Sequence, residues 1–156
     1  MVRPPSLNPI PETQERRAAL SREISAATGL DDAVLERLVR AFYLRAREDA
    51  MLGPLFDRVY DWEAHIAKIT TFWSSVVLMT GRYHGQPLAA HVPLELQPQH
   101  FKRWLALFEK TATSICSPEA VTYLMEKARR IAQSLEFGSA VQRGDLPLRT
   151  RGTAPV

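Results

Sequence analysis

Apolar residues recur every three or four positions along most of this 156-residue chain. That spacing is typical of helices that bury one face, and no segment alternates apolar and polar residues as a strand would. The pattern therefore predicts an all-α protein. The helices are expected over residues 13–28, 32–48, 62–79, 87–91, 98–115 and 118–137.

Residues that favour helix ends flank these segments. Asp31, Asp61 and Ser117 stand directly before three of them, where a side-chain oxygen can accept a hydrogen bond from a free backbone N–H. Gly29 and Gly138 follow two of them, at the position where many helices end in a left-handed conformation. These residues set the predicted helix ends, and Gly138 is expected to close the last helix.

The remaining segments indicate how the chain is divided. Residues 1–11 are rich in proline and predict a flexible lead-in, and residues 139–156 predict a flexible basic tail. One folded domain is expected over residues 12–138. Within it, "LGPLF" at 52–56 is expected to be a loop, because it contains the helix breakers Gly and Pro.

Composition and charge narrow the class of protein. Apolar residues make up 46% of the chain and charged residues 24%, which is ordinary for a globular protein in water. The formal net charge of +3 comes from the two ends of the chain rather than from a basic face, so no nucleic-acid partner is expected. No segment approaches the roughly 20 apolar residues of a membrane span, so no membrane association is expected.

Cysteine content and missing motifs restrict the chemistry. The single cysteine, Cys116, allows no disulfide within the chain, and the start of the sequence lacks the apolar run of a secretory signal. We therefore expect a reducing, cytoplasmic compartment. The sequence contains no phosphate-binding loop, no dinucleotide fingerprint and no nucleophile elbow, so hydride or phosphoryl transfer by the chain itself is unsupported.

Three polar side chains fall on predicted apolar helix faces. Tyr43, His65 and Trp104 each lie within an apolar stripe with spacings of three and four. A core role, in which each polar atom finds a hydrogen-bond partner, is the ordinary explanation for such residues. A ligand pocket is the alternative, and the pattern leaves both explanations open.

The stretch "HGQPLAAHVP" at residues 84–93 places His91 at the end of a helix barely longer than one turn. A bare zinc site takes three or four protein ligands, and His65 and His91 offer two without an HExxH spacing. Haem brings four nitrogens of its own and needs only one axial imidazole. The pattern therefore fits haem better than a bare metal, and a purely structural His91 remains the alternative.

Four motifs, in this order and spacing, resemble those of the group III truncated haemoglobins of bacteria. They are "RAFYLRAREDAMLGPLF", "DWEAHIAKITTFW", "GRYHGQPLAAH" and "HFKRWLALFEKT", and the resemblance covers about residues 30–137. The absence of any Gly-Gly pair agrees with this group. The resemblance implies a two-on-two helical sandwich of the truncated globin type, here with an additional N-terminal helix, around one haem b.

The resemblance also implies roles for particular residues. His91 matches the proximal ligand of the haem iron. Matches to the distal ligand-binding pocket are Tyr43, His65, Ile69 and Trp104. Haem contacts are implied for Phe56, Lys68, Phe72, Trp73, Tyr83 and Leu88. The position of Lys68 is one at which globins often place a cation that pairs with a haem propionate. His84 and His100 match no ligand position and are expected at the surface.

The implied function is the binding of diatomic ligands at a five-coordinate, histidine-ligated iron. These ligands are dioxygen (O2), nitric oxide (NO) and carbon monoxide (CO), with peroxide as a further ligand. Nitric oxide dioxygenase-like or peroxidase-like chemistry would need an external reductase, because the chain has no flavin or nicotinamide fold. Two alternatives stay open, a haem-based sensor or ligand buffer without catalysis and a globin-like scaffold that has lost haem.

Overall fold

The computed structural model describes residues 13–91 and 94–144, except for the side chains of residues 88 and 89. Within these ranges the chain forms six α-helices, one short 3-10 helix and no strand. The elements are α1 (Gln14–Thr28), α2 (Asp32–Glu48), η1 (Gly53–Phe56), α3 (Trp62–Val77), α4 (Pro87–His91), α5 (Pro98–Ile115) and α6 (Pro118–Arg143).

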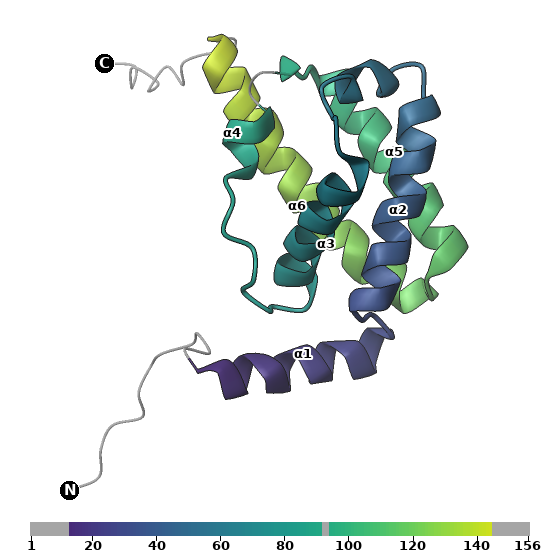
Figure 1. The fold of residues 1–156 in the computed structure, drawn as a ribbon, viewed down its shortest axis with the longest axis vertical. Coiled ribbons are helices and arrows are strands. Elements are labelled where there is room, and N and C mark those ends of the chain that lie inside the picture. Colours follow the sequence, from purple (N-terminus) through teal and green to yellow (C-terminus); the bar gives the residue numbers. More distant parts are fainter. Residues whose placement is uncertain (1–12, 92–93, 145–156) are drawn as a thin grey trace, which may run out of the picture.

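Four of the helices form two layers. α2 and α3 lie side by side in front of α5 and α6 (Figure 1), and α2 contacts both α3 and α5. α6 packs against α5 and also contacts α3, which completes the second layer. α1 crosses one end of this bundle, and the short α4 packs against α6. The arrangement confirms the prediction of an all-α, two-on-two sandwich with an N-terminal helix.

The expected capping residues mark the helix ends. Asp31 accepts a hydrogen bond from the backbone N–H of Val34 at 2.8 Å, and Asp61 and Ser117 make the equivalent bonds at the starts of α3 and α6. Gly29 ends α1 with a φ of 75°, a left-handed conformation that glycine adopts without steric cost. The predicted bounds of α2, α4 and α5 are therefore confirmed, and α1 starts one residue later than predicted.

The predicted end of the last helix at Gly138 is wrong, because α6 continues to Arg143. A glycine inside a helix costs only about 1 kcal/mol relative to alanine, which packing can offset. Ser139, the next residue, is 4% exposed, and the Arg143 guanidinium donates a hydrogen bond to the carbonyl of Leu96. Gly144, with a φ of 72°, closes the helix instead.

Two other predicted bounds differ from the structure. α3 ends at Val77 rather than at residue 79. The Tyr123 hydroxyl donates a hydrogen bond to the Val77 carbonyl, and Met79 adopts a positive φ of 58°, which is not helical. The "LGPLF" segment forms the 3-10 helix η1 instead of a loop, with Pro54 in its first turn. A proline lacks the N–H that is unpaired in that turn, so it breaks a longer helix but begins a short one.

Aromatic rings fill the space between the two layers. The ring of Trp73 on α3 stacks on Phe108 of α5 with centroids 4.9 Å apart, and Trp104 stacks on the same Phe108 at 5.3 Å. Phe42 of α2 meets both α5 rings edge-on. Large rigid side chains thus join three helices around one wall of the cavity described below.

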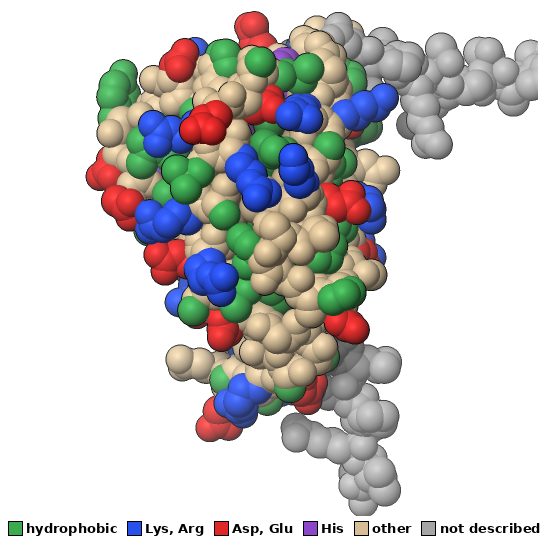
Figure 2. Space-filling model, turned by 90° about the vertical axis from the view of Figure 1, so that its right-hand side faces the viewer, with side chains coloured by type: hydrophobic (Ala, Val, Ile, Leu, Met, Phe, Trp, Pro, Cys, Tyr) green, Lys and Arg blue, Asp and Glu red, His purple; other side chains and the backbone are tan. Residues whose placement is uncertain are grey.

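One face of the molecule carries charges of both signs. Figure 2 shows the side of the molecule formed by α2 and α5, where Lys and Arg side chains alternate with Asp and Glu. None of the helices in residues 13–91 and 94–144 combines the length and the hydropathy required to span a bilayer.

Candidate functional site

A cavity of about 320 Å³ lies among α2, η1, α3, α4, α5 and α6. Its size is that of a ligand-binding pocket, and its walls are mostly apolar with a few polar groups. The sequence-predicted site residues that line it are Tyr43, Phe56, His65, Lys68, Ile69, Phe72, Trp73, Tyr83, His91 and Trp104. The side chain of Leu88, the remaining one, lies outside the described part of the structure. One cavity therefore brings together all the predicted residues whose side chains are described.

His91 enters this cavity from the end of α4 with its imidazole held in one orientation. Its Nδ1 lies 2.5 Å from the backbone carbonyl of Pro87, one turn earlier in the same helix. A carbonyl oxygen only accepts hydrogen bonds, so Nδ1 carries the proton and the lone pair of the neutral ring is on Nε2. Metal-ligating histidines are commonly fixed by such a bond to a backbone carbonyl. His91 can therefore present Nε2 as a single, preoriented ligand.

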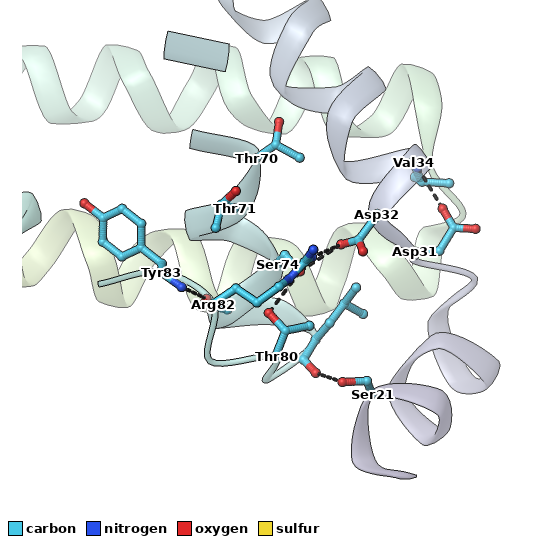
Figure 3. Close-up of polar contacts among 12 residues, drawn as sticks. Ser21, Asp31, Asp32, Val34, Thr70, Thr71, Ser74, Thr80, Arg82 and Tyr83 are labelled. Carbon is cyan, nitrogen blue, oxygen red and sulfur yellow. Dashed lines mark hydrogen bonds and ion pairs between the residues drawn. The ribbon is translucent and has the colours of Figure 1, made fainter. Parts of the chain in front are cut away.

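The loop between α3 and α4 is held by a polar network, which Figure 3 shows. Arg82 donates to the Asp32 carboxylate at 2.8 Å and to the Ser74 hydroxyl at 2.7 Å. Ser74 is completely buried and also donates to Asp32, while Thr80 lies 3.1 Å from its hydroxyl. The network joins the start of α2, the end of α3 and the loop that leads to α4.

Tyr43 and His65 bring further polar atoms to the cavity. Burial raises the pKa of the Tyr43 phenol well above its usual value, so the hydroxyl keeps its proton. Burial also lowers the pKa of His65, and the charges of Lys68 and His91 lower it further, so this ring stays neutral. The Nε2 atom of His65 is buried and has no hydrogen-bond partner among the described residues. A buried polar atom of this kind is rare in native proteins and indicates a missing partner.

Several lining residues were not identified as site residues from the sequence. They are Leu52, Leu55, Arg58, Val59, Pro87, Ala90, Leu94, Leu96, His100, Phe101, Ile131, Ala132 and Leu135. Phe101, Ile131 and Leu135 belong to predicted apolar stripes, so those stripes were the available signal. Arg58 and Leu94 lie outside the predicted helices, where no periodicity indicates their direction.

The prediction that His100 is a surface residue is wrong, because it lines the cavity and is only partly exposed. Its Nδ1 accepts a hydrogen bond from the backbone N–H of Gln97 at 2.9 Å, as part of a capping box at the start of α5. This cap turns the imidazole back toward the segment before α5. His84 is exposed, as predicted.

The donor set suits a prosthetic group that brings its own metal ligands. In residues 13–91 and 94–144, no group of three or more His, Cys, Asp or Glu side chains is placed to hold a bare metal ion. The cavity instead offers one oriented histidine, large apolar walls, the unpartnered His65 Nε2 and the cations Lys68 and Arg58. Haem needs one axial imidazole and an apolar cavity, and its two propionates favour nearby cations, so the residues present fit haem.

A two-on-two helical sandwich with one histidine presented to an apolar cavity defines a globin of the truncated class. No protein-family model matches the sequence. The chain is 34% identical to the group 3 truncated hemoglobin ctb of Campylobacter jejuni subsp. jejuni over an alignment of 108 residues, and the match covers 65% of this chain and 85% of that protein. The chain therefore belongs to the group III truncated haemoglobins.

A solved structure supports the same assignment. The fold matches the crystal structure of group III truncated hemoglobin from Campylobacter jejuni with a TM-score of 0.64 and 32% sequence identity. The match covers 69% of this chain and 90% of that chain. The resemblance inferred from the four sequence motifs is thus confirmed, and the chain is a haem globin.

Proposed function

We propose that His91 is the proximal ligand of a haem b and that the opposite side of the cavity holds a diatomic gas. The observation that carries this proposal is the bond between His91 Nδ1 and the Pro87 carbonyl, which leaves Nε2 as the ligand atom. Haem, if bound by His91, would supply an iron that can bind dioxygen, nitric oxide or carbon monoxide.

Tyr43, His65 and Trp104 would bind the gas by donating hydrogen bonds to it. The phenol of Tyr43 stays protonated, the indole of Trp104 carries an N–H, and the Nε2–H tautomer of His65 is a third donor. Each such bond in a dry cavity is worth about 1–3 kcal/mol, or about tenfold to a hundredfold in dissociation rate. With three such hydrogen-bond donors, the cavity would retain a bound ligand rather than release it rapidly.

The remaining predicted residues would hold the porphyrin. Phe56, Phe72, Trp73 and Tyr83 contribute aromatic surface to the cavity wall. Ile69 is proposed instead to add an apolar side chain to the distal ligand-binding pocket. Leu88 is proposed to add a further haem contact. Lys68 lines the same cavity and would pair with a haem propionate, since an ammonium favours a nearby carboxylate.

Turnover of nitric oxide or peroxide would require electrons from outside the chain, so we propose an external reductase as partner. The lone Cys116 is compatible with a reducing, cytoplasmic compartment. Steady-state turnover with an added reductase separates an enzyme from a sensor or ligand buffer. Turnover well above that of free haemin supports an enzyme, and ligand binding without turnover supports a sensor.

Haemin titration of the haem-free protein tests the proximal assignment. His91→Gly should lower haemin affinity at least tenfold and change the absorption spectrum, and added imidazole should restore the spectrum by occupying the vacated space. His84→Gly is the matched control, because His84 is exposed and does not line the cavity. Unchanged affinity and spectrum in His91→Gly would exclude His91 as the ligand.

A further inference from the structure

A second hollow of about 220 Å³ lies between α2 and α3, on the other side of Tyr43 from the haem cavity. Its lining consists of Arg40, Tyr43, Leu44, Arg47, Trp62, Glu63 and Ile66. We call it the α2–α3 groove. Tyr43 is the residue common to the linings of the groove and of the cavity. Tyr43 therefore borders both spaces.

Tyr43 and three neighbouring aromatic rings form a partition between the groove and the cavity. Its ring lies 5.3 Å from Phe56 and 5.2 Å from His65, both of which line the cavity. Trp62, which lines the groove, lies 6.1 Å from Tyr43, 5.9 Å from Phe56 and 5.7 Å from His65. These contacts are between ring faces and edges, with no hydrogen bond that fixes the Tyr43 ring among the described residues.

Charged side chains and the exposed Leu44 form the rim of the groove, and the buried Ile66 lies at its floor. Arg40 makes two hydrogen bonds to the Glu63 carboxylate, at 2.8 and 3.0 Å, and the Arg47 guanidinium lies 4.0 Å above the Trp62 ring. Both contacts join α2 to α3 across the opening. Exposed ion pairs contribute little stability, and exposed side chains change rotamer within nanoseconds. Such a rim opens briefly for a small molecule.

We propose that the α2–α3 groove is the access route of diatomic gases to the haem cavity, with the Tyr43 ring as the partition that they pass. The inference rests on the proposed function, because it gives the route to the ligand side of that site. Leu44 and Ile66 offer apolar surface to an uncharged diatomic, and larger or charged molecules meet the Arg40–Glu63 pair first. A gas that enters by this route also leaves by it, so blocking it slows both rates equally and leaves the affinity unchanged.

Carbon monoxide kinetics on the haem-loaded protein test the route. Leu44→Trp places a larger side chain at the rim, and Ile66→Phe enlarges the side chain at the floor. We expect at least one of them to slow carbon monoxide association and dissociation by the same factor, about three- to tenfold. Met51→Trp is the matched control, because Met51 is an exposed apolar residue that lines neither space and should leave both rates unchanged.

Two outcomes would overturn the proposal. In the first, association in both groove variants stays within twofold of the Met51→Trp rate. In the second, carbon monoxide association slows while dissociation stays unchanged. The affinity would then fall, so the substitution would act on the bound ligand rather than on the route. Failure to take up haemin or carbon monoxide at all would instead contradict the proposed function, so the two failures are distinguishable.

Xenon provides a readout that does not depend on haem, because this apolar atom enters small apolar spaces in proteins. Under xenon pressure, the methyl resonances of Leu44 and Ile66 in the haem-free protein should shift progressively, and that of Met51 should not. Leu44→Trp should reduce the shift at Ile66 at least twofold. Equal shifts at all three positions would show that the groove holds no gas and would overturn the route.

Discussion

The ring of Tyr43 lies edge-on to the ring of His65, with the centroids 5.2 Å apart and the planes inclined by 84°. One residue comes from α2 and the other from α3, so the packing of two helices sets the distance between the two polar groups. Burial keeps the phenol protonated and the imidazole neutral, because it raises the pKa of Tyr43 and lowers that of His65. The cavity thus holds two uncharged polar groups side by side before any ligand arrives.

Removal of the Tyr43 hydroxyl should accelerate ligand loss. We expect Tyr43→Phe to raise the dioxygen dissociation rate tenfold to a hundredfold, which corresponds to the loss of one hydrogen bond of about 1–3 kcal/mol. Stopped-flow displacement of dioxygen by carbon monoxide measures this rate. Tyr60→Phe is the control, because Tyr60 is 96% exposed. A change of less than threefold in Tyr43→Phe would contradict the role of its hydroxyl as a donor.

Replacement of His65 should stabilise the haem-free protein. Its Nε2 is buried without a partner, and such an atom costs about 1–3 kcal/mol that an apolar side chain of similar size avoids. We expect His65→Leu to raise the free energy of unfolding in urea by about 1 kcal/mol, while His84→Leu leaves it unchanged. A lower stability in His65→Leu would show that the imidazole already has a partner in the haem-free protein.

The ion pair between Asp49 and Arg103 should make stability depend on pH at the acid end. Arg103 lies 2.5 and 2.7 Å from the same Asp49 oxygen, and this contact holds the pKa of Asp49 below its usual value of about 4. A lowered pKa in the folded state means that the pair stabilises above that value and that the contribution is lost as pH falls.

Asp49→Asn should therefore lower the free energy of unfolding at pH 7, and this difference should shrink as pH falls below the usual pKa of an aspartate. Urea unfolding between pH 2 and 7 gives the gap between the original protein and the variant at each pH. Asp57→Asn serves as the control, since Asp57 is exposed and has no ion pair within the described residues. A gap of constant size over this range would mean that Asp49 acts through its backbone contacts alone.

Loss of Arg82 should loosen the proximal side of the cavity. Its side chain is 53% exposed, so we expect Arg82→Ala to cost only about 1 kcal/mol of stability. Haem retention should change more clearly, because the α3–α4 loop leads to His91. Transfer of haemin to an excess of apomyoglobin should become at least threefold faster, and Arg129→Ala, on the exposed face of α6, should not change it. Equal transfer rates would show that α4 is positioned independently of the loop.

Local chemistry made the helix starts predictable. Asp31, Asp61 and Ser117 cap their own helices within three residues, so the information is contained in a short stretch of sequence. The end of α6 was not predictable in this way. The burial of Ser139 and the contact of Arg143 with Leu96 depend on residues more than 40 positions away, and these outweigh the local preference of Gly138.

The same distinction holds for the site. Tyr43, His65 and Trp104 lie on periodic apolar faces, so the pattern showed their direction but left core and pocket roles open. For His91, the spacing of ligands favoured a haem site over a bare-metal site but did not exclude a purely structural histidine. The role of proximal ligand came only from the family resemblance. His100 escaped prediction because its direction depends on the capping box with Gln97, and a histidine in that position has no fixed sequence signature.

The contact between Arg143 and the Leu96 carbonyl gives the last turn of α6 a part in the binding site. Leu96 belongs to the cavity wall, and Arg143 lies at the far end of the longest helix in the described chain. This hydrogen bond ties the last turn of α6 to the cavity wall. Residues beyond 137, where the family resemblance ends, thus help to support the binding site.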